Sequence, residues 1–297
     1  MKIFLTGGTG FVGKTLIKKI IDKGYNILLL SSNYKKAKSL ENKYKNISFI
    51  SANNSHEDII EKVKSFKPDV TIHLAALVSA SDDFNIAQKL VDINLSYLVK
   101  VLDVIKYSPP KLFINTGTFA EYYKNDNNLN PAYLYAATKT ASKYIVKYYS
   151  NAYDFNYINV IPYSIYGPND TQKKLIDYLI ESANIEIDFT KGEQILDFIH
   201  VEDVAKAYLS LSENYSKLKT GENFYLGTGV GTSILELSKI IENKLNKTLN
   251  INWGGKNYRK RDVMKAIAPV DKNNNKIPWK AEIELEIGIQ DLCANLK

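Results

Sequence analysis

Short apolar runs alternate with amphipathic segments of helical period along the first 161 residues of the chain. An apolar run of about five residues is typical of a buried strand, whereas apolar positions three and four apart indicate a helix. Strands are expected at Ile3–Thr6, Asn26–Leu30, Val70–Leu74, Leu112–Thr116 and Asn156–Ile161, and helices at Gly13–Lys23, Ser55–Phe66, Gln88–Ile105 and Tyr133–Tyr149. This alternation predicts the α/β fold class, with a doubly wound parallel sheet and helices on both of its faces.

The alternation breaks after Tyr163 and returns as a strand followed by a helix at Leu196–Leu211. Irregular segments beyond the strand ends commonly carry a substrate site. We therefore expect a dinucleotide-binding Rossmann domain of residues 1–164 and 192–228, and a smaller C-terminal substrate-binding lobe of residues 165–191 and 229–297. The successive asparagines in Asp271–Lys276 predict an exposed loop.

The formal charge of +7 raises the question of a nucleic-acid partner. The lysines are spread along the chain rather than clustered, which indicates a solvated surface and no nucleic acid; a positive field around an anionic substrate is the alternative. No apolar run reaches the length of a membrane span, and Gly7 and Gly8 end the first apolar stretch early. Because Cys293 is the single cysteine, an internal disulfide is excluded. We expect a cytoplasmic protein with no membrane partner and, since no cluster has metal-ligand spacing, no metal.

A glycine-rich turn follows the first expected strand and opens the first expected helix. Gly7 permits the tight turn, Gly10 lets the backbone approach a pyrophosphate, and Gly13 lets helix and strand pack closely. Backbone N–H groups at the helix start, around Phe11 and Val12, favour a bound anion. The turn therefore predicts a dinucleotide site; a tight turn without a ligand is the alternative.

The end of the second expected strand distinguishes the two nicotinamide dinucleotides. A carboxylate there binds the ribose 2′-hydroxyl of NAD, whereas hydroxyl and ammonium groups suit the 2′-phosphate of NADP. The sequence at this point is Ser31, Ser32 and Asn33, followed by Lys35 and Lys36. We expect NADP(H) rather than NAD(H); the alternative is that the lysines simply begin a helix.

Tyr135 and Lys139 are four residues apart in an expected helix and therefore share one face. A fixed ammonium beside a buried phenol predicts a lowered tyrosine pKa and proton exchange near neutral pH. Thr118 follows the strand before this helix and can donate a hydrogen bond to a reacting oxygen. Tyr133 is the rival phenol, but an alanine stands four residues beyond it.

These features resemble the extended short-chain dehydrogenase/reductase family, which comprises nucleotide-sugar epimerases, dehydratases and reductases, over nearly the whole chain. The supporting segments are Thr6–Gly13, His73–Ala76, Asn94 within Asp92–Leu95, Thr118, Tyr135 with Lys139, Tyr166–Pro168 and Asp197–Val204. The resemblance implies that Tyr135 is the catalytic acid/base, that Lys139 also holds the nicotinamide ribose, and that Thr118 orients the substrate oxygen.

The resemblance also extends the set of cofactor residues. It implies that Leu74, Ala75 and Ala76 line the cofactor site, and that Asn94 there is a structural residue that distorts its helix rather than a reactant. Asn53 stands where relatives place an aspartate on the adenine, and its amide still permits a hydrogen bond to the base.

The residues after Thr118 favour one branch of this family. Dehydratases carry an Asp–Glu pair there, whereas this chain has Phe119 and Ala120. Epimerases generally keep NAD bound and use an acidic residue at the end of the second strand, which this chain lacks. Both departures favour simple reduction by an exchangeable NADPH.

Three segments resemble the 4-ketoreductases of the CDP-abequose and CDP-paratose synthase type: Tyr166–Lys174, Gln194–Phe198 and Tyr258–Met264. The likeness implies a substrate diphosphate, which Arg259 and Lys174 would clamp by charge-assisted hydrogen bonds. Leu196 replaces an arginine that relatives often place on this diphosphate, and Ser164 replaces an asparagine that often contacts the substrate.

The sequence thus favours NADPH-dependent reduction of the 4-keto group of a nucleotide-activated 4-keto-6-deoxy or 3,6-dideoxyhexose. An NAD-dependent nucleotide-sugar 4-epimerase is the alternative, and a non-catalytic NADP-sensing regulator is the alternative of another class. The resemblance further implies a homodimer formed through the helices around Gln88–Ile105 and Tyr133–Tyr149.

Overall fold

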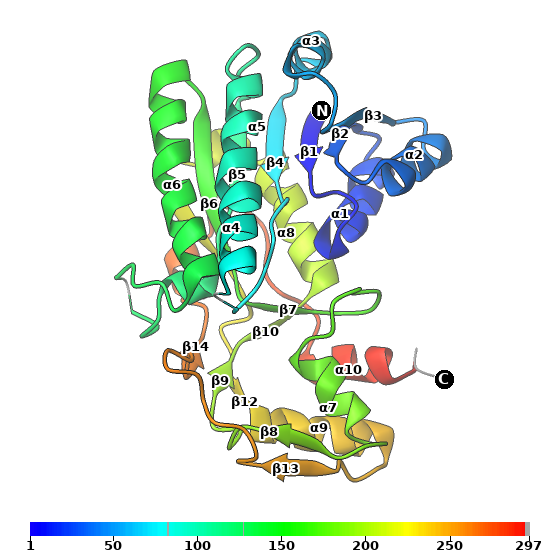
Figure 1. Ribbon diagram of the computed structural model, residues 1–297. Coiled ribbons are helices and arrows are strands. Elements are labelled where there is room, and N and C mark those ends of the chain that lie inside the picture. The colour runs from blue at the N-terminus through cyan, green and yellow to red at the C-terminus, as the bar shows by residue number, and fades with distance from the viewer. Residues whose placement is uncertain (82, 127, 295–297) are drawn as a thin grey trace.

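A seven-stranded, all-parallel sheet forms the upper half of the protein in the computed structural model, which describes residues 1–81, 83–126 and 128–294 (Figure 1). The strand order is β11-β6-β5-β4-β1-β2-β3. The strands are β1 (Lys2–Thr6), β2 (Asn26–Ser31), β3 (Ile47–Ser51), β4 (Val70–His73), β5 (Leu112–Thr116), β6 (Asn156–Pro162) and β11 (Glu222–Leu226). The predicted doubly wound parallel sheet is confirmed.

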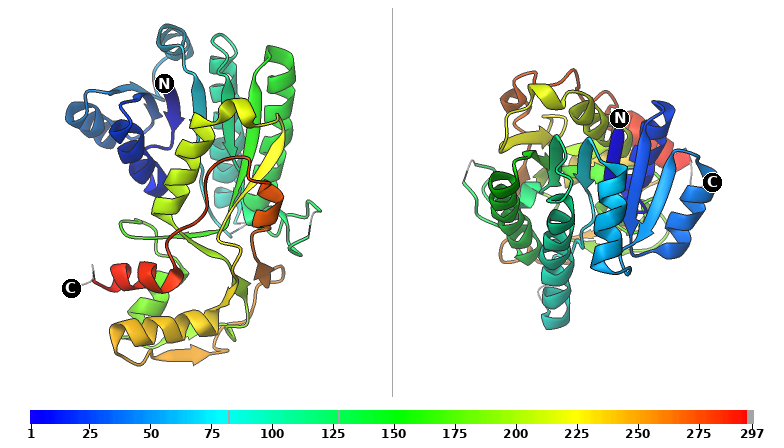
Figure 2. Two further views of the ribbon diagram at one scale, coloured as in Figure 1. Left: turned by 180° about the vertical axis from the view of Figure 1, so that it is seen from behind. Right: turned by 90° about the horizontal axis from the view of Figure 1, so that it is seen from above.

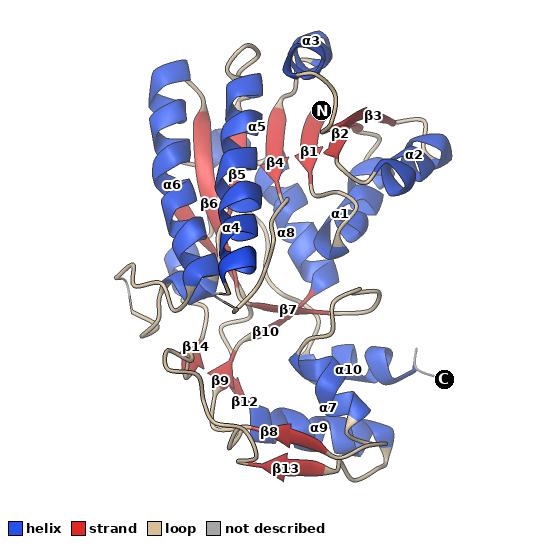
Figure 3. Cartoon of the chain, viewed as in Figure 1, coloured by secondary structure: helices blue, strands red, loops and turns tan. Residues whose placement is uncertain are grey.

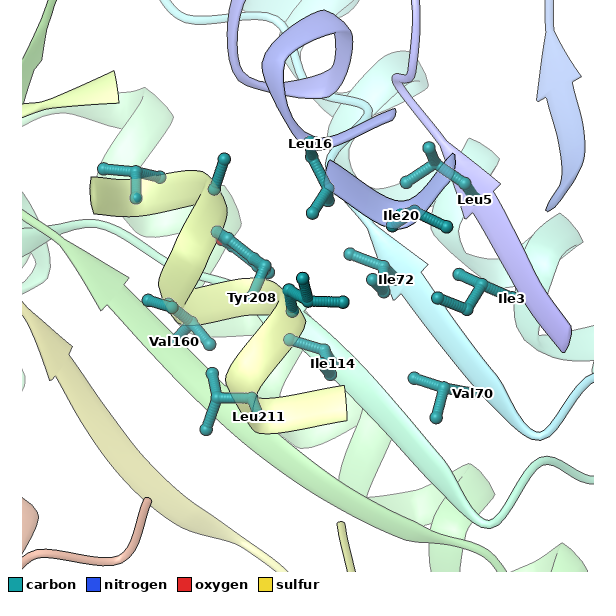
Figure 4. Close-up of a cluster of buried hydrophobic side chains, with 14 of the residues drawn as sticks. Ile3, Leu5, Leu16, Ile20, Val70, Ile72, Ile114, Val160, Tyr208 and Leu211 are labelled. Carbon is teal, nitrogen blue, oxygen red and sulfur yellow. The ribbon is translucent and has the colours of Figure 1, made fainter. Parts of the chain in front are cut away.

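Helices cover both faces of this sheet (Figure 2). One face carries α1 (Phe11–Asp22), α2 (Tyr34–Lys43) and α8 (Val201–Glu213), and the other carries α3 (His56–Phe66), α4 (Phe84–Val91), α5 (Tyr97–Ile105) and α6 (Leu134–Tyr153). Figure 4 shows Leu16 of α1 and Tyr208 of α8 packed over the sheet against Ile72 and Ile114. Two separate apolar cores therefore fix the sheet between its helical layers.

The structure adds features that the apolar pattern missed. Strand β3 was not expected, because Ser48 and Ser51 interrupt its apolar run at the edge of the sheet. A π-helical turn, Asp92–Ser96, separates α4 from α5 within the single helix expected at Gln88–Ile105. The expectation of an exposed loop at Asp271–Lys276 is partly wrong, because Val270–Asn273 forms a 3-10 helix. The buried Asn273 side chain bonds both the N–H and the carbonyl of Tyr225 in β11.

A smaller lobe lies below the carboxyl ends of the sheet strands (Figure 3). Its strands form three small sheets: β7 (Ser164–Tyr166) with β10 (Phe198–His200); β9 (Ile195–Leu196) with β12 (Thr232–Ser233) and β14 (Lys265–Ala266); and β8 (Ile187–Phe189) with β13 (Ile251–Trp253). The helices α7 (Leu175–Glu181), α9 (Ile234–Leu245) and α10 (Leu285–Ala294) pack on a third apolar core. The domain boundaries placed from the sequence stay a prediction.

Within the described residues, no helix combines the length and the apolar character that crossing a membrane requires.

Candidate functional site

The glycine-rich turn joins β1 to α1 at the carboxyl edge of the sheet. Gly7 has a φ of +72°, and a Cβ there would lie 2.5 Å from the backbone nitrogen of Ala75. A Cβ on Gly13 would collide with the carbonyl oxygen of Gly7. Gly10 is the N-cap of α1 and offers no side-chain acceptor to the first turn. The backbone N–H groups of Phe11 and its neighbours therefore face a turn that has the shape and polarity to accept a pyrophosphate.

The end of β2 lies beside this turn, as its pairing with β1 requires. Ser31 is buried, and its Oγ accepts the N–H of Asn33 at 3.1 Å. Asn33 caps α2 by accepting the N–H of Lys36, so its amide is engaged in helix formation. Ser32, Lys36 and Asn53 are exposed and remain accessible to a ribose phosphate or an adenine.

The loop after β4 passes directly over the glycine turn. Thr6 Oγ1 lies 2.8 Å from His73 Nδ1 and also accepts the N–H of Ala75, which ties β1 to this loop. Burial first, and then Lys139, lowers the pKa of His73 to about 3, so His73 is neutral. The segment Leu74–Ala76 therefore lies against the turn, where the sequence analysis expected it to line the cofactor.

Asn94 is buried in the π-helical turn and holds the next part of this loop. Its Oδ1 accepts the N–H of Leu77 at 2.8 Å, while its Nδ2 donates to the Leu77 carbonyl and to Thr138 Oγ1, each at 3.0 Å. The π-helical turn agrees with the expectation that Asn94 distorts its helix. Asn94 therefore links the cofactor loop to α6.

Thr118, Tyr135 and Lys139 gather at the carboxyl edge of β5 and the first turns of α6. All three are buried, with 6%, 7% and 2% of their surfaces exposed. Thr118 and Tyr135 line a cavity of about 730 Å³ between the sheet and the lobe. The structure thus brings together the hydroxyl and the phenol that the sequence analysis selected, with the lysine one helical turn further on.

The protonation of this group differs from the sequence-based expectation. The expected lowering of the Tyr135 pKa is wrong for the protein without bound ligands: burial raises it, and Tyr133 and Glu121 add to the rise. The Thr118 hydroxyl acts in the opposite direction. Burial lowers the pKa of Lys139 to about 8, although Glu121 opposes this effect. Removal of water on burial is thus the largest influence on the Tyr135 pKa, and Tyr135 is a protonated acid at neutral pH.

The fully buried carboxylate of Glu121 is a further member of this group that was not expected from the sequence. It lies in the 3-10 helix Phe119–Glu121 and accepts the backbone N–H of Thr118 at 2.9 Å. Its other oxygen lies 2.8 Å from Lys143 Nζ. The spacing Thr-x-x-Glu is the signature of a capping box, and a second lysine four residues after Lys139 extends the same helical face. These two signals could have singled out each residue, but their contact depends on the tertiary structure.

The expected substrate residues have different surroundings. Ser164, Lys174 and Arg259 all line the cavity, as does Leu196. Lys174 Nζ lies 2.6 Å from Asp170 and 4.9 Å from the ring centroid of Phe11, so it connects the lobe to the start of α1.

Arg261, two residues after Arg259, has a structural position. Its guanidinium donates to the carbonyls of Pro131 and Ala132 and stacks on Tyr123. Arg259 is therefore the arginine of this segment that is placed to meet a ligand in the cavity.

Residues 3–227 match the family model described as the NAD dependent epimerase/dehydratase family. The chain is 29% identical to CDP-abequose synthase of Salmonella typhimurium, over 99% of this chain and 98% of that protein. It is 26% identical to UDP-glucose 4-epimerase of Mycolicibacterium smegmatis, over 81% and 82% of the two chains. UDP-glucuronic acid 4-epimerase from Bacillus cereus, solved with UDP-glucuronic acid and NAD, superimposes over 100% of both chains with a TM-score of 0.86 and 21% identity. This last likeness shows the shared fold.

Proposed function

Because the chain belongs to the NAD dependent epimerase/dehydratase family, we propose that this nucleotide-sugar enzyme uses NADPH to reduce the 4-keto group of its substrate. The proposed substrate is a CDP-linked 4-keto-6-deoxy or 3,6-dideoxyhexose. The similarity to CDP-abequose synthase over nearly the full length supports the CDP-linked class.

One observation carries the proposal: a buried, protonated phenol and a buried hydroxyl line the same cavity. Tyr135 donates its proton to the oxygen at carbon 4, and Thr118 donates a hydrogen bond that stabilises the developing alkoxide. Tyr135 is protonated at neutral pH, as the proton donor of a reduction must be. Lys139, as an ammonium, stabilises the phenolate left behind.

The glycine turn supports the nicotinamide cofactor. Gly7 and Gly13 leave no room for a Cβ, and the first turn of α1 has no side-chain cap, so the backbone N–H groups suit a pyrophosphate. When bound, NADPH supplies the hydride. The exposed Ser32 and Lys36 would hold the 2′-phosphate, with Ser31 supporting the turn beneath them, and the lack of an acid at the end of β2 supports NADP(H) over NAD(H).

The apolar lining of the cavity supports a deoxygenated sugar. The rings of Phe119 and Tyr163 stack with centroids 5.6 Å apart, and both line the cavity next to Thr118. Phe119 occupies the first position of the acidic pair used by dehydratases. An aromatic wall at this place favours a methyl or methylene group of the sugar over a hydroxyl group.

The remaining contacts complete the proposal. Arg259 binds the substrate diphosphate from the lobe, with Ser164 beside the sugar and Lys174 at the entrance to the glycine turn. We expect a homodimer, because exposed apolar side chains lie on α4 and α6, among them Phe84, which is 80% exposed. We also expect the enzyme to work in the cytoplasm.

A 4-epimerase is the second candidate, supported by the similarity to UDP-glucose 4-epimerase. Such an enzyme retains its nicotinamide through the cycle and consumes none. A cofactor-sensing regulator, the third candidate, binds the dinucleotide without turnover.

One panel separates these candidates. The purified protein is incubated with NADPH, and separately with NADH, together with CDP-, dTDP- or GDP-4-keto-6-deoxyhexoses, while the absorbance of the reduced cofactor is followed. In parallel it is incubated with UDP-hexoses without added cofactor, and the sugar products are analysed. The reductase consumes NADPH in proportion to substrate, with the CDP-linked sugar converted most efficiently. Tightly bound NAD released on denaturation, with interconversion of UDP-hexoses and no net loss of NADPH, establishes the epimerase instead. NADPH binding without turnover on any sugar nucleotide supports the regulator.

A further inference from the structure

Glu121 is a fully enclosed carboxylate next to the reaction centre. None of its surface is exposed, and hydrogen-bond partners surround both oxygens. Oε1 accepts the N–H of Thr118, and Oε2 accepts the hydroxyl of Thr140 at 3.3 Å and meets Lys143 Nζ at 2.8 Å. Lys143 Nζ also donates to the Tyr122 hydroxyl at 3.1 Å. An ionised carboxylate this deeply buried needs such compensation.

Lys143 lies on the same face of α6 as the candidate catalytic residues. Tyr135, Lys139 and Lys143 follow one another at intervals of four residues, and all three are buried. This face therefore presents one phenol and two ammonium groups in consecutive turns. Glu121, which lies on the 3-10 helix opposite, is the carboxylate that pairs with the second ammonium.

A salt bridge of this kind is weak evidence for stability, because apolar residues of similar size often replace a buried ion pair at no cost. What distinguishes this pair is its contact with Thr118. The carboxylate fixes the backbone of the residue whose hydroxyl lines the cavity, and the pair adds one charge of each sign beside Tyr135 and Lys139.

We infer that Glu121, held in place by Lys143, is a positioning residue of the reaction centre: it orients Thr118 toward the reacting oxygen and balances the charge around Lys139. The inference rests on the proposed function for the identity of the reaction, but the charge relationship exists without turnover.

The groups around Lys139 predict opposite effects of the two charges. Glu121 raises the pKa of Lys139 and Lys143 lowers it, in addition to the lowering by burial. The remaining titratable neighbours are uncharged at neutral pH: Tyr135 on α6, and His73 on β4, whose pKa is about 3. The two members of the pair therefore act on the Lys139 pKa in opposite directions, and together they add no net charge.

The effect of the two charges is tested by titrating Lys139. The titration is followed through the 13Cε NMR signal of Lys139, which is assigned as the signal missing from the Lys139→Arg variant. Glu121→Gln keeps an oxygen acceptor for Thr118 and removes the negative charge; we expect the Lys139 titration to move down by about one pH unit. Lys143→Met removes the repulsion and is expected to move the titration upward. The double variant Glu121→Gln/Lys143→Met, which is neutral like the native pair, returns it close to the wild-type value. Lys147→Met, at an exposed lysine of the same helix, is the control and leaves the titration unchanged.

The orientation of Thr118 is tested by two neutral double variants. Glu121→Gln/Lys143→Met retains an acceptor for the Thr118 N–H, whereas Glu121→Ala/Lys143→Met lacks it. We expect kcat of the second to be about tenfold lower than that of the first, with the same dissociation constant for NADPH. A higher kcat in the variant with glutamine at position 121 identifies the hydrogen bond to the Thr118 N–H as the cause of the difference.

The role of Glu121 and Lys143 in setting the charge around Lys139 is overturned by either of two results: the Lys139 titration shifts in the same direction in both single variants, or it shifts in neither. Equal kcat of the two double variants overturns the orienting role. Opposite titration shifts in a protein that turns over no sugar nucleotide instead support the charge relationship and reject the proposed function.

Discussion

The phenol rings of Tyr133 and Tyr135 stack with their centroids 6.3 Å apart at the start of α6, and both line the cavity. Tyr135 is the one followed by a lysine one helical turn later. Since the two phenols share the cavity, comparing variants of the two residues separates proton donation from general contact with the substrate.

We expect Tyr135→Phe to lower kcat by about 10²- to 10⁴-fold, because it removes the proton donor and leaves the ring in place. NADPH binding, measured by fluorescence titration, should stay within twofold of wild type. Tyr133→Phe is the matched control and should keep most of the activity. If Tyr133→Phe instead abolishes turnover while Tyr135→Phe retains it, the roles of the two phenols are reversed.

The burial of Lys139 predicts a pH-dependent cost to stability. Its pKa is lowered from the usual 10.5 to about 8, so between these pH values the unfolded chain binds the extra proton and stability rises with pH. We expect the difference in free energy of unfolding between Lys139→Met and wild type to decrease by about 3 kcal/mol between pH 8 and 10.5. Urea denaturation at several pH values measures this difference, and other titrating groups cancel in the comparison.

The exposed Lys147 on the same helix provides the control, and Lys147→Met should show a flat difference over that range. A flat difference for Lys139→Met as well would mean that the ammonium is solvated. The same titration predicts that kcat/KM falls as the pH rises above about 8, since Lys139 then loses the charge that stabilises the phenolate.

A carboxylate at the end of β2 should reverse the cofactor preference. In Ser31→Asp the new side chain can still accept the N–H of Asn33, but it repels a 2′-phosphate. We expect the dissociation constant for NADPH to rise at least about tenfold, whereas that for NADH should stay the same or fall. Ser65→Asp, at an exposed position on α3, adds the same charge away from the turn and should change neither constant. Equal weakening of both cofactors would point to local unfolding of the turn.

The outer face of α6 should carry the dimer contact. Tyr144 and Tyr148, one helical turn apart, are each 64% exposed. We expect the double variant Tyr144→Asp/Tyr148→Asp to be monomeric in sedimentation velocity, because charges in the core of an interface are costly. Tyr34→Asp, at a 58% exposed tyrosine on α2, is the control and should sediment like the wild-type protein. A wild-type protein that is itself monomeric at micromolar concentration would contradict the expectation.

At the reaction centre, residue spacing predicted the positions of the functional side chains but not their protonation. The spacing of Tyr135 and Lys139 predicts a shared helical face, and the polar end of the preceding strand brings Thr118 to the same edge of the sheet, as the structure has it. The same reasoning gave the wrong direction for the Tyr135 pKa. It counted the neighbouring charge but could not count the water removed when the phenol is buried.

The sequence by itself determined the doubly wound sheet and the position of the glycine turn. Both follow from local rules: apolar periodicity decides which segments pack as strands or helices, and a backbone at φ +72°, as at Gly7, favours glycine. The tertiary structure alone decided that Glu121 meets Lys143 and that Asn273 pairs with Tyr225. Burial and distance between residues remote in the sequence depend on how the whole chain packs, and these quantities set the charges at the reaction centre.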